Sequence, residues 1–218
     1  KPKGWHRTWD FGPQDYDESN FTDHVVTTWV TEQLGNKHDK PFLLAFGFYR
    51  PHVPFFPPRR VYDCFKDVQR PRVDNDDWSD IPDAARKVTL SNPKIPTHDW
   101  MRENGRWEEA VHAYLACVRW TDEQLGRVLN ALDNGPHAEN TIVVLFSDHG
   151  YHLGEKECGV KFTLWEKANR VPFILVAPGV GKPGSVCGGP VSLVDIYPTL
   201  VELAGLPPKA DNDGASLV

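Results

Sequence analysis

The stretch TIVVLFSDHGYHLGEKECGVKF, residues 141–162, decides the expected fold, because it joins a strand pattern to a polar loop. Its first part, residues 141–147, is a short run of apolar and β-branched residues, which is typical of a strand buried on both faces. The run ends at Asp148, His149 and Gly150. In a layered α/β sheet ligands bind beyond the carboxyl ends of the strands, so this strand end is the first candidate site.

Two interpretations of Asp148 and His149 are open. A carboxylate and an imidazole in adjacent positions can bind one divalent cation if the chain turns between them, and Gly150 permits such a turn. The same residues can instead form an Asx-type turn that merely closes the strand. On these residues alone, neither interpretation is favoured over the other.

Lys161 lies in the same stretch and precedes an aromatic and aliphatic run, residues 162–174. Packing of this run would hold the lysine stem and direct its ammonium group, which suits stabilisation of an anionic oxyester. His152, in the intervening loop, is expected either to contact a substrate or its leaving group, or to be a solvated loop histidine.

A second candidate group is YRPHVPFFPPRR, residues 49–60. His52 stands between Pro51 and Pro54, whose rings restrict the backbone on both sides. It also follows the apolar run KPFLLAFGFYR, residues 40–50, which we expect to be a buried strand of a parallel sheet. His52 is therefore expected in the same crevice as Asp148.

Three arginines add positive charge near His52: Arg50, Arg59 and Arg60. They could line a site for an anionic substrate. They could equally pair with the acidic run DNDDWSD, residues 74–80.

Hydrophobic periodicity predicts the other elements. Helices are expected at 22–35, 107–133 and 192–206, the last capped by Ser192 or Asp195, and a third strand at 171–179. The inward side chains expected of the helix at 22–35 are Val25, Trp29, Val30 and Leu34; those of the helix at 107–133 are Val111, Leu115, Val118, Leu125, Leu129 and Leu132. Asp122 falls on the second stripe, and we expect it to be buried and bonded to a neighbouring loop rather than catalytic.

Residues 51–107 are expected to form a long irregular excursion on the substrate side.

Composition excludes several classes of protein. The 218 residues carry a formal net charge of −6, which argues against nucleic-acid binding. No apolar stretch approaches the roughly 18 to 20 residues that cross a bilayer, so no membrane partner is expected. Four cysteines, Cys64, Cys117, Cys158 and Cys187, contain no C-x-x-C pair, which argues against a zinc cluster.

Three longer motifs carry a family resemblance: SDHGYHLGEK with VKFTLWE and RVPFILVAPG, KPFLLAFGFYRPHVPF, and DIYPTLVELAGLPP with DGASLV. They resemble the formylglycine-dependent sulfatases of the alkaline phosphatase superfamily, and most of all the iduronate-2-sulfatase-like branch and its bacterial polysaccharide-sulfatase relatives. The resemblance covers nearly the whole chain. It implies an α/β sandwich with a mostly parallel central sheet flanked by helices.

The resemblance also implies roles for single residues. Asp148 and His149 match ligands of a calcium-like cation, with Mn²⁺ or Mg²⁺ as alternatives. Lys161 matches the lysine that contacts the sulfate and the bridging oxygen, and His52 matches the histidine that binds the sulfate or assists the leaving group. His152 and Arg50 are expected to contact the substrate.

One part of the family pattern does not occur in these 218 residues. The family nucleophile is a formylglycine made from the cysteine of C-x-P/A-x-R, and none of the four cysteines stands in such a motif. The chain also begins without Met. We therefore expect residues 1–218 to be the middle and later part of a sulfatase catalytic domain, inactive alone, which needs the preceding part of the same enzyme.

The expected activity of the complete enzyme is hydrolysis of sulfate esters, on a sulfated sugar or polysaccharide. One alternative keeps the fold and changes the substrate to a phosphonate or phosphodiester. The other is a non-catalytic binder of sulfated glycans. By family resemblance, the protein is expected to be exported to the periplasm or outside the cell, or lysosomal.

Overall fold

The computed structural model describes residues 9–65, 67–73, 77–91 and 95–218. The chain divides into two compact units, of which the first comprises Lys1–Ala138 with His149–Arg170 and the second Glu139–Asp148 with Val171–Val218. The boundary therefore separates the neighbouring residues Asp148 and His149. Within the described residues, no helix is both long and apolar enough to cross a membrane.

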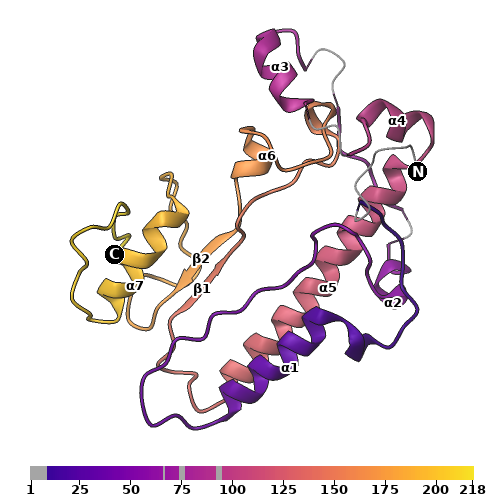
Figure 1. The fold of residues 1–218 in the computed structure, drawn as a ribbon. Coiled ribbons are helices and arrows are strands. Elements are labelled where there is room, and N and C mark those ends of the chain that lie inside the picture. Colours follow the sequence, from indigo (N-terminus) through magenta and orange to yellow (C-terminus); the bar gives the residue numbers. More distant parts are fainter. Residues whose placement is uncertain (1–8, 66, 74–76, 92–94) are drawn as a thin grey trace. The chain divides into compact units, whose positions relative to one another are not determined.

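Two long helices form the centre of the first unit, α1 (Thr22–Gly35) and α5 (Trp107–Asp133), as the sequence predicted. Figure 1 shows α1 lying along the later half of α5. Phe21, at the start of α1, packs with Trp120 of α5 and with the short helix α2 (Arg59–Tyr62) in one buried cluster.

The faces that these helices bury agree only in part with the expected stripes. Val30 and Leu34 of α1 and Val111 and Leu132 of α5 are buried as predicted. On α5 the buried face carries small residues, including Ala113, Ala116 and Cys117, which allow close packing. Val118 and Leu129 of the predicted stripe are 41% and 37% exposed, and Val25 and Trp29 of α1 are also exposed. Asp122 is exposed as well, so the prediction that it is buried was wrong.

The run at residues 40–50, predicted to be a strand, is not assigned as one. It is extended, yet Phe42, Leu43 and Phe46 are exposed, Leu43 to 83%. A strand is stabilised by the ladder of hydrogen bonds to a neighbouring strand. The strand prediction fails here because the run has no assigned ladder partner among the described residues.

The excursion at residues 51–107 is only partly irregular. Besides α2 it contains α3 (Asp83–Thr89) and α4 (His98–Glu103). Parallel bridges from Phe11 to Phe55 and from Gln14 to Pro58 tie its beginning to the N-terminal segment. Residues 66, 74–76 and 92–94 lie outside the described residues, and with them part of the acidic run at 74–80.

The second unit contains the other two predicted strands, β1 (Val143–Phe146) and β2 (Phe173–Val176). They pair antiparallel, with Val143 opposite Val176. An antiparallel pair also occurs in mixed sheets that are otherwise parallel.

The predicted helix at residues 192–206 is observed as a 3-10 turn, η3 (Leu193–Asp195), followed by α7 (Ile196–Leu203). Ser192 and Asp195 form the capping box at its start, which confirms the predicted caps. The remaining short elements are η1 (Glu18–Asn20), η2 (Glu155–Glu157) and α6 (Glu166–Asn169).

Candidate functional site

The strand end at β1 presents the first two candidate residues. Asp148 is exposed, and His149 is half-buried. The Nδ1 atom of His149 lies 2.7 Å from the carbonyl oxygen of Gly150, which makes Nδ1 the protonated nitrogen. The lone pair of this tautomer is on Nε2, the form in which a neutral imidazole binds a metal.

Gly150 is required at this point by close packing and not by a left-handed turn. Its N–H donates to the carbonyl of Ala168 at 2.7 Å. A Cβ atom at this position would lie 2.0 Å from the carbonyl oxygen of Lys167, in α6. The glycine therefore lets the chain after His149 run directly against the backbone of α6.

Residues 149–163, the site loop, are closed by hydrogen bonds inside the loop. The N–H of His152 donates to the carbonyl of Val160 at 3.1 Å, and the hydroxyl of Tyr151 donates to the carbonyl of Gly159 at 2.7 Å. The side chains of Val160 and Cys158 are buried. The loop is thus a compact structure whose later side carries Lys161.

His152 is completely buried at the centre of this loop. Its Nδ1 atom lies 3.0 Å from the carbonyl oxygen of Glu155, and its Nε2 atom lies 2.9 Å from the hydroxyl of Thr163. Burial lowers the pKa of His152, so the neutral ring is favoured. In the sequence His152 was a candidate for substrate contact; the structure places it where it joins the two sides of the loop.

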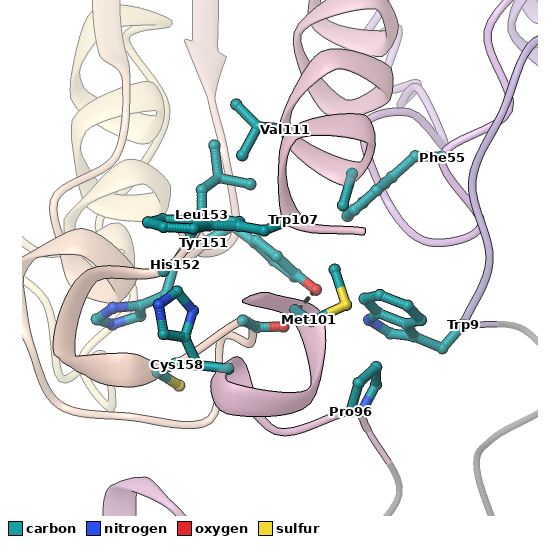
Figure 2. Close-up of a pocket in the computed structure, with 14 residues that line it drawn as sticks. Trp9, Phe55, Pro96, Met101, Trp107, Val111, Tyr151, His152, Leu153 and Cys158 are labelled. Atoms are coloured by element: carbon teal, nitrogen blue, oxygen red, sulfur yellow. Dashed lines mark hydrogen bonds between the residues drawn. The ribbon is translucent and has the colours of Figure 1, made fainter. Parts of the chain in front are cut away.

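A small cavity of about 30 Å³ lies behind the site loop. Figure 2 shows Trp9, Met101, Trp107 and Leu153 around it, with the hydrogen bond from Tyr151 drawn as a dashed line. The indole N–H of Trp107 donates to the carbonyl of Leu153. A space of this size holds about one water molecule, so the cavity belongs to the packing of the loop and does not fit a substrate.

Lys161 follows the buried Val160 and is itself half-buried. Its Nζ atom lies 5.9 Å from the centre of the Phe162 ring, which is 67% exposed. The ammonium group therefore lies beside an exposed ring. The expectation that the lysine stem is held and its ammonium group directed stays a prediction.

His52 is exposed, at the other candidate segment of the first unit. Its Nδ1 atom lies 2.8 Å from the carbonyl oxygen of Val53, and its ring lies 5.1 Å from that of Tyr49. The hydroxyl of Tyr49 donates to the same carbonyl at 2.7 Å. These contacts, together with the two flanking prolines, give the exposed ring a defined orientation.

Arg50 is used inside the protein. It forms a buried ion pair with Asp23 of α1, at 3.1 Å, and its Nε–H donates to the carbonyl of Phe56 at 2.9 Å. Asp23 also accepts the N–H of Tyr49 at 2.6 Å. The side chain of Arg50, expected to contact substrate, instead fixes the backbone that presents His52.

Arg59 and Arg60 have acidic partners, but not those considered in the sequence analysis. Arg59 pairs with Asp15, and Arg60 pairs with Glu18 and Glu123. All of these side chains are substantially exposed, so each pair contributes little to stability.

The sequence analysis missed Asp23. A signal for it exists, because Asp23 shares a helix face with Thr27, Val30 and Leu34, all of them buried. A charge on the buried face of a helix indicates a buried partner of opposite charge.

The metal-ligand set is partial. Among residues 9–65, 67–73, 77–91 and 95–218, no group of three or more His, Cys, Asp or Glu side chains is arranged to hold a metal ion. Asp148 and His149 are consecutive oxygen and nitrogen donors, which fit two positions of a divalent-cation site. Any further ligands would have to come from other residues.

Comparison with known proteins identifies relatives over almost the whole chain. The sequence model of the family described as Sulfatase matches residues 5–206. A sulfatase from Formosa agariphila is 42% identical over 211 residues, which cover 96% of this chain and 41% of that protein. The iduronate 2-sulfatase of Mus musculus is 31% identical over 77% of this chain and 36% of its own length.

Among solved structures, the phosphonate monoester hydrolase of Silicibacter pomeroyi superposes with a TM-score of 0.75 at 20% identity. The superposition covers 97% of this chain and 46% of that one, and at this identity it shows a common fold alone. The predicted α/β fold class is thereby confirmed. The chain spans less than half of the length of each of these three proteins.

Proposed function

This chain belongs to the sulfatase family, and from that premise we propose that it forms part of an enzyme that hydrolyses sulfate esters. The observation that carries the proposal is the site loop. It begins at His149, whose Nε2 lone pair is set by the Nδ1 hydrogen bond, and ends beyond Lys161, which follows the buried Val160. A cation ligand and a directed ammonium group on one closed loop suit the transfer of an anionic group.

Asp148 and His149 would hold a divalent cation, with Ca²⁺ as the first choice and Mn²⁺ or Mg²⁺ as alternatives. When bound, such a cation withdraws charge from the oxygens of the group being transferred. Lys161 would place its ammonium group at the sulfate and the bridging oxygen, and His52 would bind the sulfate or assist the departing alcohol. The cation specificity and these roles are part of the proposal.

The nucleophile would come from a part of the enzyme outside these 218 residues. No cysteine here stands in C-x-P/A-x-R, the motif from which formylglycine is made. Burial raises the pKa of Cys158 to about 11 and that of Cys117 to about 12, so both thiols are protonated at neutral pH. A protonated thiol is a poor nucleophile, which agrees with a structural role for these two cysteines.

Two residues take different roles from those first expected of them. His152 would act as a positioning residue, because its ring joins the two sides of the site loop. Arg50 would act in the same way at the second segment, since its guanidinium is paired with Asp23 and lies over the ring of Phe21. Both residues would support catalysis indirectly, by positioning the groups that touch the substrate.

The proposed substrate is a sulfated sugar or polysaccharide, which the name of the mouse relative, iduronate 2-sulfatase, supports. The second candidate is a phosphonate or phosphodiester hydrolase, which the fold shared with the Silicibacter pomeroyi enzyme favours. By the same family argument, we propose that the protein is exported or lysosomal.

The test is an assay of the longest natural protein that contains this chain, after mass spectrometry for a cysteine converted to the aldehyde. Aryl sulfate, aryl phosphonate and sulfated monosaccharides would be compared in buffers with and without Ca²⁺. Release of sulfate that needs the divalent cation would support the proposal. Faster release from the phosphonate than from the sulfate would favour the second candidate, and binding of sulfated sugars without turnover would indicate a non-catalytic protein.

Replacement of Lys161 gives the residue-level control. Lys161→Ala should lower kcat by roughly 10²- to 10³-fold, the loss typical of one group that stabilises transition-state charge. Lys167→Ala is the matched control, because Lys167 also lies in residues 149–170 and its side chain is 63% exposed. Equal activities of the two variants would remove Lys161 from the proposed site.

A further inference from the structure

Lys156 of the site loop is held by an acidic residue and two aromatic rings, contacts that the sequence pattern did not predict. Its Nζ atom lies 2.6 Å from the Oδ1 atom and 2.7 Å from the carbonyl oxygen of Asp77. The same atom lies 4.9 Å from the ring centre of Trp165 and 5.5 Å from that of Trp78. We call this arrangement of Lys156 with Asp77, Trp78 and Trp165 the lysine clamp.

The clamp is a defined structure and not a chance surface pair. The side chain of Lys156 is only 18% exposed, and the two indole rings meet edge to face with centres 6.2 Å apart. An ammonium group over aromatic faces is attracted by the ring quadrupoles, more strongly when it is shielded from water. The three partners come from both sides of the lysine in sequence, so the clamp ties distant segments together.

Three further contacts reinforce it. The indole N–H of Trp165 donates to the hydroxyl of Thr89, at the end of α3, at 2.8 Å. Arg86 of α3 pairs with Glu157 at 3.4 Å and lies over the ring of Trp78. The segment 77–89 is therefore attached to the site loop at several points.

The backbone of the loop needs such an attachment. Lys156 and Glu157 have φ angles of 55° and 52°, in the left-handed region that side-chain-bearing residues seldom adopt. These conformations persist only where surrounding contacts determine them. The contacts that hold these two residues from outside the loop are Asp77 on Lys156 and Arg86 on Glu157.

We propose that Lys156 is a positioning residue for Lys161: the clamp holds segment 77–89 against the site loop and so fixes the position of the catalytic lysine. Val160, next to Lys161, is bonded through its carbonyl to His152 on the inner side of the loop. The clamp holds the outer side of the same loop. The catalytic consequence rests on the proposed function, whereas the effect on the loop does not.

The clamp also joins the site loop, which carries Lys161, to part of the excursion at residues 51–107 that was expected on the substrate side. Movement of segment 77–89 would therefore change the position of the lysine ammonium. A displacement of about 1 Å at a reacting group can cost about 10²-fold in rate. Loss of the Lys156 ammonium group should loosen the site loop only partly, so the rate should fall by less than this.

The experiment compares Lys156→Met and Lys156→Arg in the active enzyme. Lys156→Met keeps the length of the stem and removes the charge, and we expect kcat to fall by about tenfold with KM changed by less than about threefold. Lys156→Arg keeps a cation that stacks on indole rings and pairs with a carboxylate, and should restore most of kcat. The matched control is Lys209→Met, because Lys209 and Asp211 form an exposed pair without aromatic rings.

Amide hydrogen exchange of residues 157–163 supplies a readout that does not depend on activity. We expect exchange in Lys156→Met to be about tenfold faster than in the wild type and unchanged in the control. If Lys156→Met misfolds, Trp165→Phe, which keeps a ring but weakens the cation–π contact, should give a smaller change in the same direction.

The outcomes separate the two proposals. Wild-type kcat and wild-type exchange in Lys156→Met would overturn the clamp, and so would a loss of kcat with unchanged exchange that Lys156→Arg does not restore. A wild-type protein that releases no sulfate, but whose site loop exchanges faster in Lys156→Met, would overturn the proposed function and leave the positioning of the loop supported.

Discussion

Two segments of the first unit, residues 149–163 and residues 41–52, carry candidate site residues and are held in different ways. The first is closed on itself around the buried ring of His152, with Lys161 at its later end. The second is extended and largely exposed, and it is fixed at its end by the ion pair between Arg50 and Asp23. The first segment is held mainly by contacts inside the loop, and the second by contacts at its end, among which the Arg50–Asp23 pair is buried.

This difference indicates which substitutions should displace each segment. Residues 149–163 are held by several hydrogen bonds inside the loop and by the clamp at Lys156, so the loss of one contact should loosen the loop without releasing it. In residues 41–52 the loss of one carboxylate should release the chain, because Asp23 accepts from both Tyr49 and Arg50. Substitutions can test each half of this comparison.

The largest effect is expected for Asp23→Ala. This change leaves Arg50 buried without its partner, which typically costs about 3 to 5 kcal/mol. Asp15→Ala is the control, because the pair of Asp15 with Arg59 is exposed and should contribute little to stability. The measurement is the free energy of unfolding from urea titrations of the two variants. Equal losses would mean that the second segment has no special anchor.

A smaller loss, of about 1 to 3 kcal/mol, is expected for Gly150→Ala. The new methyl group would overlap the backbone of α6, because the Cβ position lies 2.0 Å from the carbonyl oxygen of Lys167. Gly126→Ala in α5 is the matched control: nothing lies within 4 Å of its Cβ position, and helix propensity favours alanine by roughly 1 kcal/mol. We expect Gly150→Ala to lower the urea midpoint and Gly126→Ala to raise it. A destabilisation by both would contradict the assignment of the effect to close packing at Gly150.

The support behind the site loop should also respond to pH. Burial, with a contribution from Arg102, holds the pKa of His98 below its ordinary value of about 6.5. Since the folded pKa is lowered, the unfolded chain binds the proton first as the pH falls. The stabilisation is therefore complete above about pH 6.5 and is lost as the pH falls through the folded pKa.

Thermal unfolding at pH 7.5 and pH 5.0 measures this effect. The wild-type Tm should fall by a few degrees more than that of His98→Phe, which keeps a ring against Trp107 but does not titrate. His152 has the same direction of shift and remains in both proteins, so it contributes equally to both. Identical pH profiles would show that His98 is not protonated differently in the folded and unfolded chains.

The elements formed by local pattern could be predicted from the sequence, whereas the choice of helix face could not. The bounds of α1 and α5 agree with the periodicity because helix ends depend on nearby residues. The face of α5 was predicted from its large aliphatic residues, of which Val111 and Leu132 are buried, but the buried face also includes the small residues Ala113, Ala116 and Cys117. Asp122 was misplaced for the same reason.

Some features of the candidate site could likewise be predicted from the sequence, and others could not. The positions of Asp148, His149 and Lys161 after a strand follow from the order of residues along the chain. The ion pair of Arg50 with Asp23 joins residues far apart in sequence, and the clamp of Lys156 depends on a left-handed backbone that no sequence pattern indicates for a lysine. Long-range pairs of this kind are decided by tertiary packing, which single-sequence patterns do not contain.

The smallest effect is expected for Leu43→Ser in this chain. Leu43 is 83% exposed, and substitutions at such positions usually change stability by less than about 0.5 kcal/mol. In a longer protein that supplies a neighbouring strand, the same run would be covered, and the same substitution would then cost about 1.5 to 3 kcal/mol of lost burial. Urea titrations of Leu43→Ser in both lengths of protein compare the two states directly. A small effect in both would show that residues 41–48 remain exposed in the longer protein, and that the apolar run does not form the strand its sequence predicts.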